Sequence, residues 1–142
     1  MAGIVVGVDG SANSRKALEM AVEEAVLRHL PLTVLTVHQA VRDVYGAASH
    51  YEDDASMTEK ARQAAQAETD EVLAAASARP ESVTVTAVHG LPAEELVKAS
   101  EGADLLIVGR RGNSGWARLT MGAVTSAVAH HSHSPVLIVA HN

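Results

Sequence analysis

Residues 105–112 read Leu105-Leu106-Ile107-Val108-Gly109-Arg110-Arg111-Gly112, and after nine further residues the chain continues Gly122-Ala123-Val124-Thr125. The apolar run before Gly109 is typical of a buried β-strand, and residues 123–131 have a helical pattern. Glycine lacks Cβ, so the backbone can turn sharply and approach a ligand closely. A helix N-terminus adds unpaired N–H groups and a partial positive charge. A strand, a glycine loop and a helix start that follow one another are typical of a phosphate-binding site, although the same glycines would also serve an ordinary strand-to-helix turn.

Working outward from this stretch, apolar runs alternate with helical patterns along the chain. Strands are expected at residues 4–8, 32–37, 83–88, 104–108 and 136–140, and helices at about 14–29, 57–79, 92–102 and 123–131. Residues 39–56 show no clear period, and the acidic run Glu52-Asp53-Asp54 is expected to be solvated surface. Apolar strands alternating with helices predict an α/β fold, with a parallel sheet covered by helices on both faces. No linker or repeat divides the chain, so residues 1–142 are expected to form a single domain.

The composition restricts the classes of partner. Apolar residues make up 47% of the chain, yet it has no Phe and one Trp, so the core must be built from Val, Leu, Ile and Ala. A net charge of −6 and no Lys/Arg run longer than a pair argue against nucleic acid or an anionic membrane as the main partner. The absence of cysteine excludes disulfides. The sequence has no signal-peptide pattern and no apolar stretch of bilayer length, so a cytoplasmic location is expected.

Asp9 follows the first expected strand, and Gly109 follows the fourth. In doubly wound sheets, ligands bind beyond the carboxyl ends of the strands, at the point where the strand order reverses. Asp9 and the glycine loop therefore face one crevice if these two strands are neighbours, which the pattern alone leaves open. The Asp9 carboxylate then either accepts hydrogen bonds from a ligand or caps the turn that follows it.

Three segments together resemble the universal stress protein family, in its small single-domain, nucleotide-binding form. They are the opening Ile4-Val5-Val6-Gly7-Val8-Asp9-Gly10-Ser11, the spacing G-x-x-G-(nine)-G at Gly109, Gly112 and Gly122, and the closing Ser134-Pro135-Val136-Leu137-Ile138-Val139. The resemblance covers nearly the whole chain. It implies a five-stranded parallel sheet of order 3-2-1-4-5, with helices on both faces. It also implies ATP, with or without Mg²⁺, in the crevice between the first and fourth strands.

Carried over by position, the resemblance implies a role for each site residue. Asp9 would meet the adenosine, and Val8 and Val37 would flank the adenine. Val108 and Gly109 would lie beside the nucleotide, and the phosphates would be surrounded by Gly112, Asn113, Gly122, Ala123, Val124 and Thr125. The family has Ser or Thr where this chain has Ala123. A hydroxyl at this position could donate a hydrogen bond to a phosphate, and the loss of such a bond to a charged group costs about 1.5–3 kcal/mol of binding free energy. Arg111 is also expected to contact the phosphates because a planar guanidinium suits phosphate oxygens, although an arginine in this position can equally be a solvated surface residue.

The last strand, from Val136 to Ala140, carries no charge. In the order 3-2-1-4-5 it lies at an edge of the sheet, and an apolar edge invites pairing with another chain. A homodimer through this strand is therefore expected, as the resemblance also suggests.

The sequence offers no complete catalytic set. Phosphoryl transfer needs a group that holds a metal ion and a group that orients the nucleophile, but no second acid or lysine accompanies Asp9 and Thr125. An ATP-binding stress-response or regulatory protein is the main hypothesis. The alternatives are a slow ATPase or nucleotidyl-transfer enzyme, and a dimeric adaptor with a nucleotide-free crevice. No metal ligands are expected, because His130, His131 and His133 lack a second ligand cluster.

Overall fold

The computed structural model describes residues 2–39, 41–42, 48–49, 54–111 and 122–140. Five parallel strands form its main sheet: β1 (Ile4–Val8), β2 (Leu32–Gln39), β5 (Val83–Gly90), β6 (Leu105–Gly109) and β7 (Val136–Val139). Their order is β5-β2-β1-β6-β7, which is 3-2-1-4-5 when these five strands are counted along the chain. All four neighbouring pairs are parallel, so the expected fold class and strand order are confirmed.

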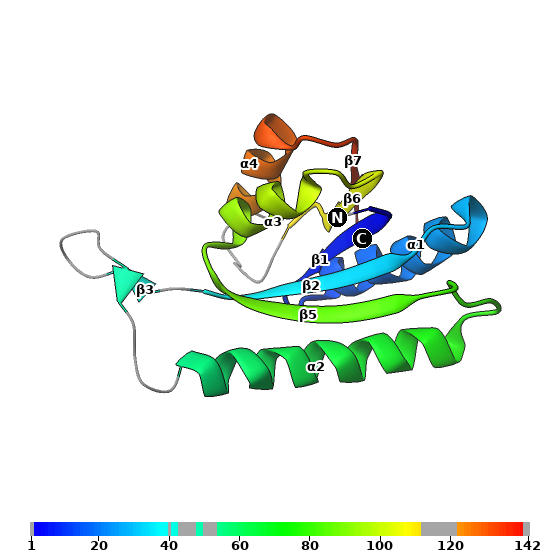
Figure 1. The fold of residues 1–142 in the computed structure, drawn as a ribbon, viewed down its shortest axis with the longest axis horizontal. Coiled ribbons are helices and arrows are strands. Elements are labelled where there is room, and N and C mark those ends of the chain that lie inside the picture. Colours follow the sequence, from blue (N-terminus) through cyan, green and yellow to red (C-terminus); the bar gives the residue numbers. More distant parts are fainter. Residues whose placement is uncertain (1, 40, 43–47, 50–53, 112–121, 141–142) are drawn as a thin grey trace.

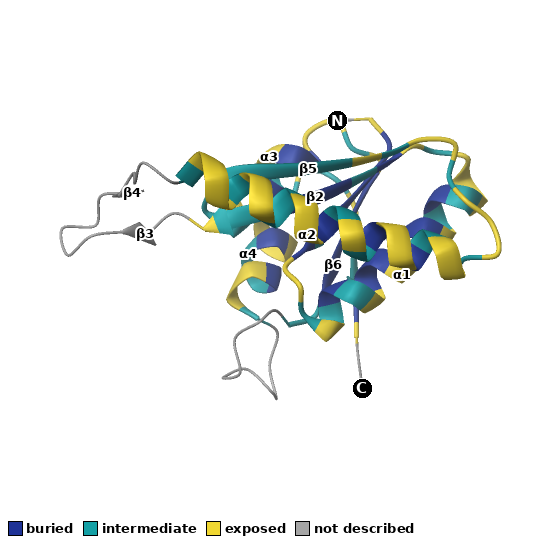
Figure 2. Cartoon of the chain, turned by 90° about the horizontal axis from the view of Figure 1, so that it is seen from below, coloured by how far each residue is buried: buried dark blue, intermediate teal, exposed yellow. Residues whose placement is uncertain are grey.

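In the described part of the chain four helices cover the sheet: α1 (Ala12–Arg28), α2 (Asp54–Ala75), α3 (Pro92–Ser100) and α4 (Ala123–His131). α1 and α2 lie on one face, and α3 and α4 on the other (Figures 1 and 2). Side chains of each strand alternate between these layers. Val6 packs into the core beneath α1 and α2, whereas its neighbour Val5 packs beneath α3 and α4. The sheet is therefore buried on both sides, which explains its continuous apolar strands.

The first strand-to-helix turn is set by short-range hydrogen bonds. Gly10 has φ +82°, a left-handed conformation that glycine adopts without steric cost. Ser11 is the N-cap of α1, and its side chain accepts a hydrogen bond from the Ser14 N–H at 3.1 Å. The buried face of α1 then follows helical spacing, through Ser14, Ala17, Leu18, Ala21, Val22 and Ala25. The result is a helix held close against β1 and β6.

The structure differs from the sequence-based expectation mainly between β2 and β5. α2 begins at Asp54 rather than residue 57, and it ends at Ala75, four residues before Arg79. Residues 41–42 and 48–49 form the short antiparallel pair β3 (Val41–Arg42) and β4 (Ala48–Ser49), where no period was detected. Strands of two residues are too short to show a hydrophobic period. No helix within the described ranges combines the length and hydrophobicity that a membrane crossing needs.

Candidate functional site

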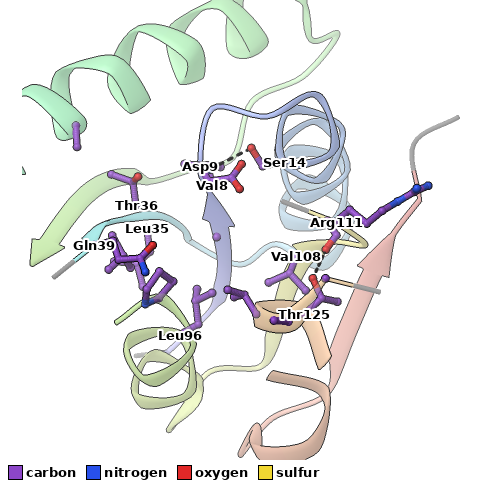
Figure 3. Close-up of a pocket in the computed structure, with 18 of the residues that line it drawn as sticks. Val8, Asp9, Ser14, Leu35, Thr36, Gln39, Leu96, Val108, Arg111 and Thr125 are labelled. Carbon is purple, nitrogen blue, oxygen red and sulfur yellow. Dashed lines mark hydrogen bonds between the residues drawn. The ribbon is translucent and has the colours of Figure 1, made fainter. Parts of the chain in front are cut away.

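A cavity of about 520 Å³ lies at the carboxyl ends of the central strands, within the size range of small-molecule sites. β1 and β6 are direct neighbours, with Ile4 opposite Leu105 and Val6 opposite Ile107. This adjacency, which the pattern alone left open, brings the end of β1 and the end of β6 to one crevice. The close-up in Figure 3 shows Val8 and Asp9 on one side of the crevice and Val108 and Thr125 on the other.

Ten of the twelve residues predicted for the site line this cavity. They are Val8, Asp9, Val37, Val108, Gly109, Arg111, Gly122, Ala123, Val124 and Thr125. The other two, Gly112 and Asn113, lie outside the described residues. The structure thus brings together side chains from the ends of β1, β2 and β6 and from the first turn of α4.

α4 begins directly at the cavity wall. Gly122 is its N-cap, with φ −63° and ψ 158°, and its own N–H donates to the Arg110 carbonyl oxygen at 3.0 Å. The first hydrogen bond of the helix runs from Ser126 N to Gly122 O at 2.9 Å. The N–H groups of residues 123–125 precede that bond, in the turn where amides lack intrahelical partners. This turn offers backbone donors and a partial positive charge to an anion in the cavity.

The Thr125 side chain has a structural partner. Its hydroxyl is buried and donates to the Gly109 carbonyl oxygen at 2.7 Å. In this conformation the hydroxyl proton is not directed at a ligand, so the predicted phosphate contact of Thr125 would have to come from its backbone N–H. The same bond holds the first turn of α4 against the end of β6.

Gly109 permits a close approach on the other face of β6. A Cβ at this position would lie 2.9 Å from the Asn13 carbonyl carbon and 3.0 Å from the Asn13 carbonyl oxygen. These are backbone atoms of the first turn of α1, which cannot move without displacing the helix. The glycine is therefore required by helix packing, in addition to any role beside a ligand.

Asp9 performs the capping role that was one of its two expected roles. Its Oδ1 accepts a hydrogen bond from the Ser11 N–H at 2.9 Å, and its own N–H donates to Ser14 Oγ at 3.2 Å. Ser14 Oγ in turn donates to the Ser11 carbonyl oxygen at 3.1 Å. A carboxylate can accept several hydrogen bonds, so this cap is compatible with a further bond to a ligand.

Charges around the cavity are mixed. Arg111 lines it, but in Figure 3 its guanidinium points away from Asp9 and the crevice. Glu68 of α2 lies close enough to Asp9 for their charges to interact. Burial raises the pKa of Glu68, Asp9 and Glu71 raise it further, and Arg15 opposes them. The Asp9 side of the crevice is therefore the acidic side, and the start of α4 is the side suited to anions.

Sequence reasoning missed several lining residues. Those it did not predict are Gly7, Ser14, Leu35, Thr36, His38, Gln39, Ala61, Pro92 and Leu96. A longer estimate of the second strand would have found two of them: β2 continues to Gln39, two residues past its expected end, and both His38 and Gln39 line the cavity. Leu96 and Pro92 come from α3, and only the packing of that helix places them there.

Comparison with known proteins assigns the chain to a family. A family model described as "Universal stress protein family" matches residues 2–140. The chain belongs to this family. Universal stress protein Rv2623 of Mycobacterium tuberculosis (strain ATCC 25618 / H37Rv) is 33% identical over 139 residues, which are 96% of this chain and 44% of that protein. The chain therefore spans about half the length of the curated relatives it matches.

Solved structures of this family share the fold. Universal stress protein UspA from Lactobacillus plantarum superimposes with a TM-score of 0.72 at 22% identity, covering 97% of both chains. A universal stress protein solved in complex with cAMP gives a TM-score of 0.67 at 26% identity, covering 97% of this chain and 95% of that one.

Proposed function

We propose that this universal stress protein is a single nucleotide-binding domain that holds ATP in the crevice between β1 and β6. The observation that carries the proposal is the convergence of β1, β6 and the first turn of α4 on one cavity. That turn supplies backbone N–H donors, and a triphosphate is the part of ATP that needs them. A family member of 26% identity was solved with the nucleotide cAMP, which supports the choice of a nucleotide as ligand.

The opposite end of the cavity suits the base and ribose. Leu35, Val37 and Leu96 give it apolar walls, and Asp9 stands beside them as a hydrogen-bond acceptor. The adenosine is proposed to lie on this side, with its phosphates directed toward Ala123 and Val124. This orientation keeps the phosphates away from Asp9 and Glu68, whose negative charges would repel them.

The role proposed for ATP is regulatory. The Thr125 hydroxyl is bonded to Gly109, and Asp9 is engaged with Ser11, so the two side chains considered for catalysis both have structural partners. Turnover therefore requires groups beyond this pair. A stress-response role and a cytoplasmic location belong to the same proposal and would be checked by expression under stress and by cell fractionation.

β7 is proposed as the contact of a homodimer. It lies at the end of the sheet and pairs with β6 on one side, and within the described residues no strand pairs with its other side. Val136, Leu137 and Ile138 are apolar and only half-buried in the single chain. Adding the same strand of a second chain would pair this edge and cover these side chains.

The deciding experiment identifies any nucleotide that is bound to the purified protein and then compares the affinities of three nucleotides. Purified protein is denatured, released small molecules are analysed by mass spectrometry, and ATP, ADP and cAMP are titrated by calorimetry with Mg²⁺. We expect ATP or ADP among the molecules released by denaturation. If the protein is purified without nucleotide, we expect ATP to bind more tightly than cAMP in the titration. If cAMP binds more tightly than ATP, the proposed ligand is cAMP and not ATP. If no nucleotide binds, the adaptor alternative is favoured. Turnover above roughly one per second would favour an enzyme.

A variant at the helix start tests the phosphate position. Gly122 has an extended conformation that valine also adopts, so Gly122→Val adds a branched side chain at the N-cap without backbone strain. We expect ATP affinity to fall while adenosine affinity changes little. Ala129→Val, at an exposed position toward the other end of α4, is the matched control. Unchanged ATP affinity in Gly122→Val would rule out phosphates at this helix start.

A further inference from the structure

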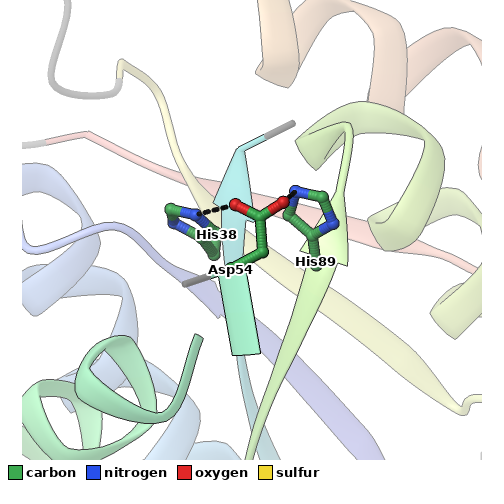
Figure 4. A group of neighbouring side chains, drawn as sticks. All are labelled: His38, Asp54 and His89. Carbon is green, nitrogen blue, oxygen red and sulfur yellow. Dashed lines mark ion pairs between the residues drawn. The ribbon is translucent and has the colours of Figure 1, made fainter. Parts of the chain in front are cut away.

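Three metal-ligating side chains meet beside the crevice, in a cluster formed by His38, Asp54 and His89. His38 lies near the end of β2 and His89 near the end of β5, and the two are direct partners in the register of the parallel strands. Asp54 is the first residue of α2, which covers these strands. Figure 4 shows the Asp54 carboxylate between the two imidazole rings, with each ring directing a nitrogen toward it.

The alternation of both strands explains this convergence. On β2 the side chains facing α2 include Leu32 and Val34, and His38 continues the same face; on β5 they include Val83 and Val85, and His89 continues it. Both histidines therefore stand side by side at the end of an apolar surface, where α2 begins. Asp54 belongs to the acidic run expected to be solvated, but its side chain is only 18% exposed.

The distances suit ligands of one metal ion better than a direct hydrogen-bonded pair. His38 Nε2 lies 3.5 Å from Asp54 Oδ1, and His89 Nε2 lies 3.6 Å from Asp54 Oδ2. Hydrogen bonds between such atoms are usually about 2.7–3.2 Å long. Zinc ligands at about 2.0–2.1 Å in tetrahedral geometry are separated by roughly 3.3 Å. One ligand atom from each of the three residues lies within 4.8 Å of the others, so small side-chain rotations would place all three around one ion.

We infer that His38, Asp54 and His89 form a binding site for a divalent transition metal of the zinc class. Two imidazoles and one carboxylate are the donors that zinc and its neighbours accept, whereas Mg²⁺ and Ca²⁺ prefer oxygen ligands alone. Three protein ligands leave one tetrahedral position for water or another ligand. All three side chains are half-buried, so the ion would be partly shielded but reachable from solvent.

A second observation comes from the same face of α2. Thr58 lies one turn beyond Asp54, and its hydroxyl is buried with no hydrogen-bond partner among the described residues. A buried hydroxyl without a partner is costly and calls for a ligand or water nearby. The partnerless hydroxyl therefore marks a place, one helical turn from Asp54, where a bound water or ligand is expected. The metal would also fix His38, which lines the nucleotide cavity as well.

The test uses the full chain, stripped of metal with a chelator and titrated with ZnCl₂ by calorimetry in the absence of nucleotide. We expect one Zn²⁺ per chain. The double variant His38→Gln/His89→Gln should weaken binding at least about 100-fold, since even the loss of a group that supports a ligand costs 10–100-fold. Asp54→Asn, which keeps the side-chain shape, should weaken it by at least about tenfold. Co²⁺ bound to the native chain should give the visible absorption of a four-coordinate site, and the double variant should lose it.

The control removes histidines elsewhere. His131→Gln/His133→Gln changes two exposed imidazoles, one on the last residue of α4 and one two residues beyond it, and should leave the affinity unchanged. Far-UV circular dichroism checks that each variant is folded. If the double variant is not folded, the zinc affinity of Asp54→Asn decides the test. No zinc binding by the native chain, equal affinity in the double variant or in Asp54→Asn, or loss of binding in the control would each overturn the site. Because no nucleotide is present, the result is independent of the ATP proposal.

Discussion

The Thr125 hydroxyl donates a 2.7 Å hydrogen bond to the Gly109 carbonyl oxygen, joining the first turn of α4 to the end of β6. Thr125→Val keeps the shape of the side chain but removes the donor, leaving a buried carbonyl oxygen without this partner. We expect the free energy of unfolding to fall by about 1–3 kcal/mol. Urea denaturation measures it, and Thr125→Ser, which keeps the hydroxyl, should lose less. Equal losses in the two variants would mean that packing, not the hydrogen bond, dominates.

Gly109 and Gly7 offer a matched pair of glycine-to-alanine changes. At Gly109 the new Cβ meets Asn13 backbone atoms at 2.9 and 3.0 Å, whereas at Gly7 it meets the end of the Leu96 side chain at 2.8 Å. A side chain can rotate away, but a helix backbone must shift as a whole. We expect Gly109→Ala to cost about 1–3 kcal/mol and Gly7→Ala to cost less. Thermal unfolding of both variants checks this order, and the reverse order would contradict it.

Most of the fold could be predicted from the sequence because buried parallel strands are continuously apolar. The expected strand at residues 4–8 coincides with β1, and the other four differ by no more than two residues at an end. The order of the strands could not be read from the local pattern, because Ile4 and Leu105 are paired across a hundred residues of chain. That order came from the resemblance to a family.

The site was predictable to the extent that it depends on chain position. Glycines after a strand and an aspartate after another mark the carboxyl edge of the sheet, and both line the cavity. Side-chain directions depend on packing and could not be predicted from the sequence. The Thr125 hydroxyl, for example, bonds to the Gly109 carbonyl oxygen, and the Arg111 guanidinium points away from the crevice (Figure 3). The pairing of His38 with His89 was missed because it requires the register between β2 and β5.

Glu68 gives the stability a defined pH dependence. Burial and nearby carboxylates raise its pKa above the ordinary 4.5, so the folded protein binds a proton more readily there than the unfolded chain does. Stability due to this group is therefore lost as the pH rises from about 4.5 through the higher folded pKa. Glu68→Gln should gain stability relative to the native protein across that interval and keep a small, solvent-screened gain at pH 7. Thermal unfolding from pH 3.5 to 7.5 measures it, with the exposed Glu81→Gln as control. A difference between Glu68→Gln and the native protein that does not change with pH would contradict the assignment.

Ala123 occupies the position where the family resemblance implies Ser or Thr, so this chain lacks a side-chain hydroxyl there. It is exposed, lines the cavity and is the first residue of α4. If phosphates lie at this helix start, Ala123→Ser adds one charge-assisted hydrogen bond, worth about 1.5–3 kcal/mol, and should tighten ATP binding by roughly tenfold or more. Calorimetric titration measures the change, and Ala129→Ser serves as the control. An unchanged affinity in Ala123→Ser would place the phosphates elsewhere in the cavity.

The outer edge of β7 is the proposed contact of the homodimer, and it can be tested by removing a backbone donor. The Leu106 and Arg110 N–H groups donate to carbonyl oxygens of Pro135 and Val139, so the alternate residue Ile138 directs its N–H away from β6. Ile138→Pro removes that outward donor and leaves the β6–β7 bonds in place. We expect a monomer by analytical ultracentrifugation where the native chain is a dimer. Ile138→Ala loses comparable packing but keeps the N–H, and should remain dimeric. A dimeric Ile138→Pro variant, or a monomeric native chain, would exclude pairing through this strand.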